Sequence, residues 1–158
     1  MRKIFLLLVL AFASFETNAQ SIIGAWEMYS TAENGDKLKS VVIIADGYQV
    51  VSTYDAKTGK FVQTTGGTWK LEGNTMTEKV EFDTVTPERV GSEVSFEVKI
   101  TDDRIQVVGA DMKLTRIDDG TPGKLQGAWL MSGRFRNGKE QSRDVNRPRK
   151  TMKILSGT

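Results

Sequence analysis

The stretch Ser21-Ile22-Ile23-Gly24-Ala25-Trp26-Glu27-Met28 decides how the chain is interpreted, because it returns later as Lys124-Leu125-Gln126-Gly127-Ala128-Trp129-Leu130-Met131. In both copies an apolar residue stands two positions before the glycine. A small residue and a tryptophan follow the glycine, and a methionine comes two positions after the tryptophan. Agreement over this many positions is much rarer than a single Gly-x-Trp. We interpret the stretch as the first β-strand of a unit that begins twice.

Residues 1–19 have the features of a removable export signal. The positive pair Arg2-Lys3 is followed by an apolar run from Ile4 to Phe15, which is too short to span a bilayer with margin, and then by a small-residue exit at Ala19. The chain also has no cysteine that could carry a lipid anchor. We expect an exported protein, periplasmic or secreted, with cleavage after Ala19 and no transmembrane segment in the mature chain.

After the leader, short segments of strand type alternate with turn signals such as Asn34-Gly35 and Asp46-Gly47, and helical signals are almost absent. The pattern predicts about eight antiparallel strands, with Gly66-Gly67 as a bulge or bend inside the fourth. Eight hairpin-connected strands can close into an up-and-down barrel. We therefore expect an all-β barrel over residues 20–118, with an open sandwich as the alternative. The expected strands cover 24–30, 38–45, 48–54, 60–71, 75–82, 93–101, 104–108 and 112–117.

Residues 119–123 have the composition of a linker, and 124–158 are expected to be an incomplete second repeat. Residues 151–157 echo residues 40–47, the second expected strand. Two strands cannot bury their own apolar face. These residues therefore either add to the first barrel or begin a second similar unit of a longer protein, and we favour the second alternative.

The barrel pattern resembles the lipocalin-like proteins of the calycin type. In those barrels a Gly-x-Trp on the first strand lies at the closed end, and a basic residue of the last strand lies across the indole. The resemblance implies that Gly24, Trp26 and Arg116 form the barrel closure; a tryptophan face is also the best aromatic partner for a guanidinium. More narrowly, the chain is similar to uncharacterised secreted proteins of Bacteroidetes, whose longer members carry the barrel in tandem. That family lends no catalytic residue and no known ligand.

The residue types limit the chemistry. The chain contains no histidine and no cysteine, which excludes the common nucleophile–base pairs and most transition-metal sites. We expect no enzymatic activity and no cofactor. A metal-free hydrolase built on carboxylates is a third and weaker hypothesis. The paired aspartates Asp118-Asp119 lack the alternating ligands of a calcium loop, so we interpret them as a solvated turn.

One carboxylate, that of Glu78, is expected on the inner face of its strand. In 75–82, Met76, Val80 and Phe82 share the expected inner face, and the same alternation turns Glu78 inward. A carboxylate in an apolar lumen must be paired, protonated or in contact with a ligand. The alternatives are an internal hydrogen-bond network that satisfies Glu78 or a register shifted by one residue. The expected ligand-binding residues are Tyr48, Tyr54, Trp69, Glu78 and Phe96, although aromatic residues at strand spacing also serve as core filling.

Charge differs between the two parts of the chain. Residues 20–123 hold eleven basic and seventeen acidic side chains, a net charge of −6, whereas residues 124–158 hold nine and two, a net of +7. The basic stretch with Arg143, Arg147, Arg149 and Lys150 has no interleaved aromatic residues, so we expect no nucleic-acid partner. A solvated loop or docking on the acidic unit explains it.

Two functions follow as hypotheses. The first is an exported, non-enzymatic protein that binds a small apolar or amphipathic ligand in the barrel. The alternative is a structural or interaction protein of the cell envelope, with a packed barrel, no ligand and a protein partner. The filling of the lumen separates the two hypotheses.

Overall fold

The structure, a computed structural model, describes residues 22–144 and 152–157 of the 158-residue chain. The expected export signal 1–19 with its cleavage site lies outside the described residues. Arg147, Arg149 and Lys150 of the basic stretch also lie outside them.

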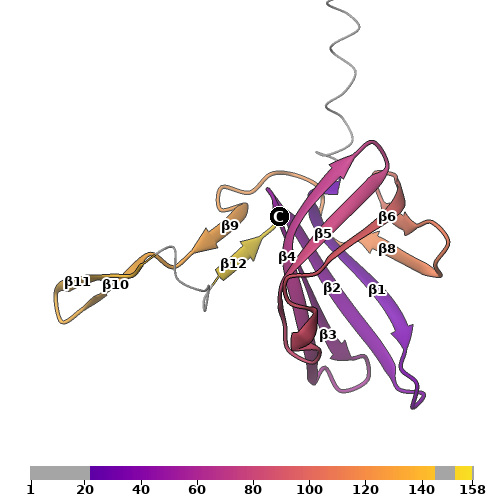
Figure 1. The fold of residues 1–158 in the computed structure, drawn as a ribbon, viewed down its shortest axis with the longest axis horizontal. Coiled ribbons are helices and arrows are strands. Elements are labelled where there is room, and N and C mark those ends of the chain that lie inside the picture. Colours follow the sequence, from indigo (N-terminus) through magenta and orange to yellow (C-terminus); the bar gives the residue numbers. More distant parts are fainter. Residues whose placement is uncertain (1–21, 145–151, 158) are drawn as a thin grey trace, which may run out of the picture.

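Eight antiparallel strands pair in chain order, and the eighth returns to the first, so the sheet closes into a barrel (Figure 1). The predicted up-and-down topology is confirmed, and the open sandwich is excluded. The 3-10 turn η1 (Pro87–Arg89) interrupts the connection between the fifth and sixth strands. The barrel strands are β1 (Gly24–Thr31), β2 (Lys37–Ala45), β3 (Tyr48–Asp55), β4 (Phe61–Glu72), β5 (Thr75–Asp83), β6 (Glu93–Ile100), β7 (Arg104–Val107) and β8 (Met112–Arg116).

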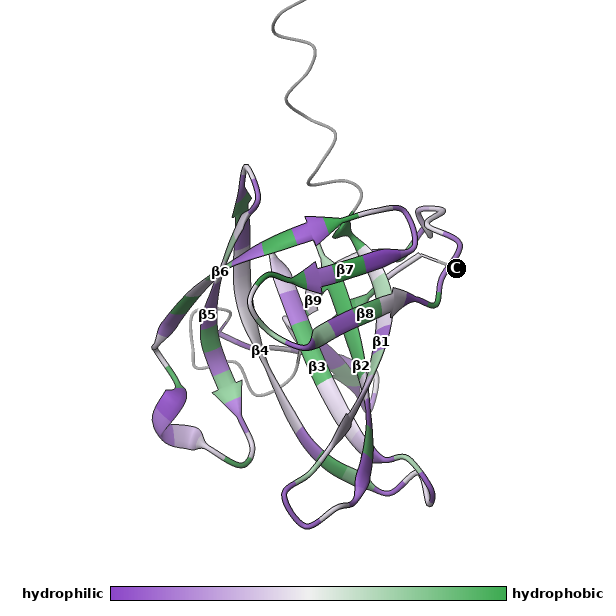
Figure 2. Cartoon of the chain, turned by 90° about the vertical axis from the view of Figure 1, so that its right-hand side faces the viewer, coloured by the Kyte–Doolittle hydropathy of each residue, from purple (hydrophilic) through white to green (hydrophobic). Residues whose placement is uncertain are grey.

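The inner face of the barrel holds one apolar cluster to which every barrel strand except β3 and β4 contributes a buried member. Strand alternation explains its composition, because buried residues recur at every second position of β1 and β2. Figure 2 shows this alternation as green bands along the strands. Seven further apolar residues, Trp69 and Phe96 among them, pack against the cluster. The cluster comprises Ile22, Trp26, Val42, Ile44, Met76, Val98, Ile105 and Leu114.

The fourth strand is continuous, and its register against β5 shifts between Gly66 and Gly67. The extra residue is Glu81 of β5, so the bulge lies in the strand that faces the predicted position and not in the fourth strand itself. A Cβ on Gly67 would overlap the carbonyl oxygen of Lys79, so close approach of β5 requires glycine there. The shift has a consequence for Phe82, which lies opposite Gly66 on the outer face. The expectation that Phe82 shares the inner face of Met76 was therefore wrong, because alternation alone does not count the bulged residue.

Four further strands follow the barrel: β9 (Gly127–Leu130), β10 (Gly133–Arg136), β11 (Lys139–Ser142) and β12 (Met152–Leu155). The pair β9–β12 lies beside the barrel, with β12 against β2 and β3. The hairpin β10–β11 projects away from it (Figure 1). This contact agrees with the sequence of β2, whose centre is apolar on both faces, because one face lines the core and the other meets β12.

The pair β9–β12 repeats the register of β1–β2. Gly127 lies opposite Leu155 as Gly24 lies opposite Ile44, and each later pair along the two strands corresponds in the same way. The indole nitrogen of Trp129 donates to the carbonyl of Leu125 at 2.8 Å, and the indole of Trp26 donates to Ile22 at 2.9 Å. The two strand pairs differ at Lys153 of β12, which occupies the position of the buried Val42 of β2.

Candidate functional site

The closed end of the barrel is formed by a contact between its first and last strands. Arg116 lies opposite Trp26 in register, and its guanidinium carbon is 4.1 Å from the centroid of the indole ring. The Nη1 of Arg116 donates to the carbonyl of Ile23 at 3.1 Å and to Oδ1 of Asp118 at 3.0 Å. The Asp118 carboxylate also accepts a hydrogen bond from the backbone nitrogen of Ala25 at 2.7 Å. The predicted pairing of Trp26 with Arg116 is confirmed.

Gly24 is part of the same closure. Its φ of +151° lies outside the region that side-chain-bearing residues favour, and an added Cβ would overlap Nη1 of Arg116. The glycine of the Gly-x-Trp stretch therefore leaves the space that the arginine occupies. Sequence reasoning missed the part played by Asp118, because this residue looked like one half of a solvated turn.

The register separates the five predicted ligand residues. Trp69, Glu78 and Phe96 lie on the inner face, since Trp69 pairs with Glu78 and Phe96 pairs with core residue Met76. Tyr48 and Tyr54 lie on the outer face, because the inner positions of β3 are its odd-numbered residues. The prediction that these two tyrosines line the lumen was wrong.

The error at β3 has a physical origin. Both faces of this strand carry apolar and polar side chains, so polarity does not tell which face is buried. Pairing with β2 decides it, since Val51 lies opposite the core residue Val42 and Thr53 lies opposite Ser40. Tyr54 instead contacts Phe61 on the outer face, with ring centroids 6.0 Å apart in an edge-to-face arrangement.

The inner face also carries polar groups that sequence reasoning missed. The hydroxyls of Ser40 and Thr53 are 2.8 Å apart and buried, so they satisfy each other. Gln49 is also buried and faces inward opposite Ile44, but its Oε1 has no hydrogen-bond partner among the described residues. A buried carbonyl oxygen without a donor is costly. The lumen therefore contains an acceptor that a water or ligand hydrogen could satisfy.

Glu78 lies between Trp69 of β4 and Val94 of β6 in the register. Burial raises the pKa of the Glu78 carboxyl above its ordinary value, and the nearby charge of Arg89 opposes that rise only in part. Val94 shares this inner face, yet 42% of its surface is exposed. Met112, on the inner face of β8, is 41% exposed. The inner face is thus accessible to solvent near Glu78 and at β8.

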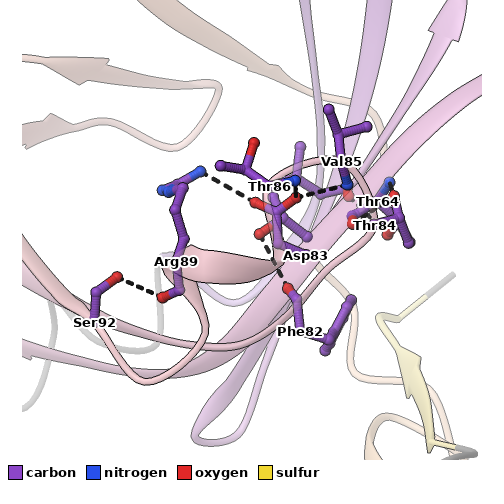
Figure 3. A network of polar contacts seen from close by, with 10 residues as sticks. Thr64, Phe82, Asp83, Thr84, Val85, Thr86, Arg89 and Ser92 are labelled. Carbon is purple, nitrogen blue, oxygen red and sulfur yellow. Dashed lines mark hydrogen bonds and ion pairs between the residues drawn. The ribbon is translucent and has the colours of Figure 1, made fainter.

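The connection between β5 and β6 is organised by Asp83, as Figure 3 shows. Its Oδ1 accepts hydrogen bonds from the backbone nitrogens of Val85 at 3.0 Å and Thr86 at 2.8 Å. Its Oδ2 lies 3.2 Å from Nη1 of Arg89. The two backbone hydrogen bonds are the main reason that the pKa of Asp83 is lowered. Arg89 is therefore tied to Asp83 while half of its side chain faces solvent.

The indole of Trp69 is held in one orientation. Its nitrogen donates to the carbonyl oxygens of Ala45 at 2.9 Å and Tyr48 at 3.2 Å. Both acceptors flank the β2–β3 turn. The N–H of the ring is thus occupied, and the ring offers its π face to neighbours on the inner surface.

A pocket of about 330 Å³ lies outside the barrel, between the closed end and residues 120–126. Among the described residues that line it, Asp118 alone carries a carboxylate, and this group already accepts hydrogen bonds from Ala25 and Arg116. We assign no chemistry to this pocket.

Within residues 22–144 and 152–157, no three acidic side chains converge in a manner suited to a metal ion. The same residues include no helix long and apolar enough to cross a membrane.

Comparisons with known proteins give one structural likeness. No protein-family model and no curated protein match the chain. The chain is similar to a lipocalin-like protein from Bacteroides uniformis ATCC 8492, whose crystal structure has a resolution of 1.79 Å. The two are 16% identical, with a TM-score of 0.40, and the match covers 61% of this chain and 96% of the other. The closed barrel assigned here rests on strand pairing and not on this likeness.

Proposed function

We propose that this chain is an exported, non-enzymatic protein that binds a small apolar or amphipathic molecule at the accessible part of its inner barrel face. The observation that carries the proposal is the exposure of inner-facing Val94 beside the partly buried carboxyl of Glu78. An exposed apolar residue inside a barrel offers contact area to a ligand, and the adjacent carboxyl offers one polar contact. The cluster around Trp26 fills the closed end.

The proposed site differs from the sequence expectation. Trp69, Glu78 and Phe96 remain in it, since their register positions share one face with Val94. Tyr48 and Tyr54 are left out because they lie on the outer face. The ligand would contact the accessible inner face around Val94 and not the packed cluster around Trp26.

The proposal is tested by native mass spectrometry of the purified protein together with binding of a fluorescent apolar probe. Val94→Trp should abolish probe binding, because the larger ring fills the accessible inner face. Glu97→Trp adds the same ring to the outer face of the same strand and should leave binding unchanged. Equal binding by both variants, or no bound molecule and no probe binding in the unaltered protein, would reject the ligand site.

Export and the lack of enzymatic activity also belong to this proposal. The leader residues 1–19 support export, and the absence of histidine and cysteine supports a binding role over catalysis. Cell fractionation followed by N-terminal sequencing tests whether the protein is exported. The expected mature chain begins at Gln20.

A second candidate function is supported by the β9–β12 pair. Its register copies β1–β2, but Trp129 is 51% exposed whereas Trp26 is fully buried. We infer that residues 124–158 begin a second repeat whose apolar face takes a protein partner. Such an interaction protein would need no ligand in the first barrel. Sedimentation analysis of Trp129→Ser against the unaltered chain tests whether this face mediates self-association.

A further inference from the structure

We propose that the ligand of the barrel carries a cationic head group with N–H donors, an alkylammonium, which Glu78 and the indole of Trp69 receive. This inference rests on the proposed binding function and names the chemical class of the ligand. Four observations support it: the pairing of a carboxyl with an indole, a buried acceptor without a donor among the described residues, the tether of Arg89 and the charge of the barrel.

The first observation is the register pair Trp69–Glu78 on the inner face. Side chains directly opposite each other on neighbouring strands have Cβ atoms about 5 Å apart, so one small group can contact both. The indole N–H is already used by Ala45 and Tyr48. What Trp69 can offer to a ligand is its π face, and an indole face next to a carboxylate attracts an organic cation.

The second observation is that the inner face has a buried acceptor without a donor. Oε1 of Gln49 has no hydrogen-bond partner among the described residues, and burial raises the pKa of the Glu78 carboxyl on the same face. Gln49 lies opposite Gly67, and Gly67 lies opposite Val80, two residues along the same face from Glu78. Because Gly67 has no side chain, the backbone of β5 approaches this position closely, and a Cβ there would overlap the carbonyl oxygen of Lys79. A head group with several N–H donors suits such a surface.

The third observation concerns Arg89, whose charge opposes the rise in the pKa of Glu78 that burial causes. Arg89 is bound to Asp83 at 3.2 Å, and its side chain is 47% exposed. It therefore neutralises Glu78 only in part. A ligand cation would compete with Arg89 for Glu78, while Asp83 holds Arg89 back.

The fourth observation is the net charge of −6 over residues 20–123, which favours cations near the barrel strands, while the net +7 of residues 124–158 belongs to the segment that follows them. A carboxylate- or sulfate-headed ligand would meet repulsion from this charge and from Glu78. A ligand with an ammonium head group would be attracted both by the negative charge of the barrel and by Glu78.

The test titrates the full chain with three amphiphiles that share a dodecyl tail: dodecylammonium, dodecyl sulfate and dodecyl maltoside. Concentrations stay below the critical micelle concentration, far-ultraviolet circular dichroism monitors the fold, and calorimetry measures affinity. We expect dodecylammonium to bind at least about tenfold more tightly than the maltoside. Glu78→Gln should lower the dodecylammonium affinity to the level of the maltoside.

Two variants complete the design. Arg89→Gln removes the internal competitor and should raise dodecylammonium affinity, while Glu97→Gln makes the same charge change as Glu78→Gln on the outer face and should have no effect. If the maltoside or the sulfate binds as well as dodecylammonium and Glu78→Gln changes nothing, the cationic class is wrong although the binding function stands. If none of the three binds, the proposed function itself fails, and this inference with it.

Discussion

The guanidinium of Arg116 lies 4.1 Å from the centre of the Trp26 ring, and this contact joins the two ends of the barrel sheet. The same guanidinium donates to Ile23, Asp102 and Asp118, so one side chain connects the last strand to the start of the first. The closed end is thus a specific structure built from the Gly-x-Trp stretch and a distant arginine.

Arg116→Gln should lower the free energy of unfolding by about 2 kcal/mol, because both the cation–π contact and several charge-assisted hydrogen bonds are lost. Urea unfolding followed by tryptophan fluorescence measures it. Arg104→Gln removes an exposed arginine of the neighbouring strand and should cost less than about 0.5 kcal/mol. Equal losses in the two variants would contradict the role of Arg116.

Gly24→Ala should destabilise the barrel more than Gly35→Ala does. Both glycines have a positive φ, but nothing lies within 4 Å of a Cβ at Gly35, whereas a Cβ at Gly24 would overlap Nη1 of Arg116. Gly35→Ala should lower the free energy of unfolding by about 1 kcal/mol, because it introduces backbone strain without any steric overlap. The additional cost at Gly24 should shrink when Arg116 is already glutamine, since the overlap with Nη1 is removed while the Asp118 oxygens stay 3.0 and 3.1 Å from the added Cβ. A double-mutant cycle of unfolding free energies checks this.

Stability should depend on pH through Glu78. Because burial raises its pKa in the folded state, the neutral carboxyl favours folding fully below the unfolded value of about 4.5, and that contribution is lost as pH rises through the higher folded pKa. The glutamine of Glu78→Gln stays neutral at every pH. The free energy of unfolding of this variant, relative to that of the unaltered protein, should therefore increase as pH rises above 4.5. Urea midpoints between pH 4 and 8 measure the gap. A gap that does not change with pH would show that Glu78 is not desolvated.

Asp83→Ala should loosen the β5–β6 connection. The carboxylate accepts hydrogen bonds from the backbone nitrogens of Val85 and Thr86, and these bonds lower its pKa. They therefore stabilise the loop above pH 3.8, and the effect is lost as pH falls through the lowered pKa. Amide exchange at Val85 and Thr86, measured by NMR, should become faster in the variant.

A matched control exists in the β3–β4 turn. Asp55 accepts hydrogen bonds from the backbone nitrogens of Lys57 and Thr58 in a similar way. Asp55→Ala should speed exchange at these two amides and leave Val85 and Thr86 unaffected. If both variants accelerate exchange at all four amides, the two turns are not independent.

Much of the barrel could be predicted because local chemistry determines it. Turn residues such as Asp46-Gly47 fix where strands end, and the closing pair of Trp26 and Arg116 follows from one recurrent stretch and its resemblance. The face of a strand is different. Tyr54 was expected inside because its strand carries apolar residues on both faces, and only pairing with β2 decides between them.

Two other features depend on geometry that alternation does not contain. A single extra residue of β5, Glu81, opposite Gly66-Gly67 moves Phe82 to the outer face. The link between Asp83 and Arg89 depends on the path of a loop with a 3-10 turn, for which the sequence has no periodic signal. Glu78 was placed correctly because it precedes the bulge along β5, where the count of alternate positions still holds.

The seam between β1 and β8 joins two residue pairs, whereas β1 and β2 share eight. A closed sheet separates most easily between the two strands that share the fewest residue pairs, so local opening of the barrel should begin between β1 and β8. Trp26 stands on that line. The fluorescence emission of Trp26 would therefore change before the β1–β2 hairpin separates. The closed barrel would first become an open sheet, and the remaining strand pairs would separate later.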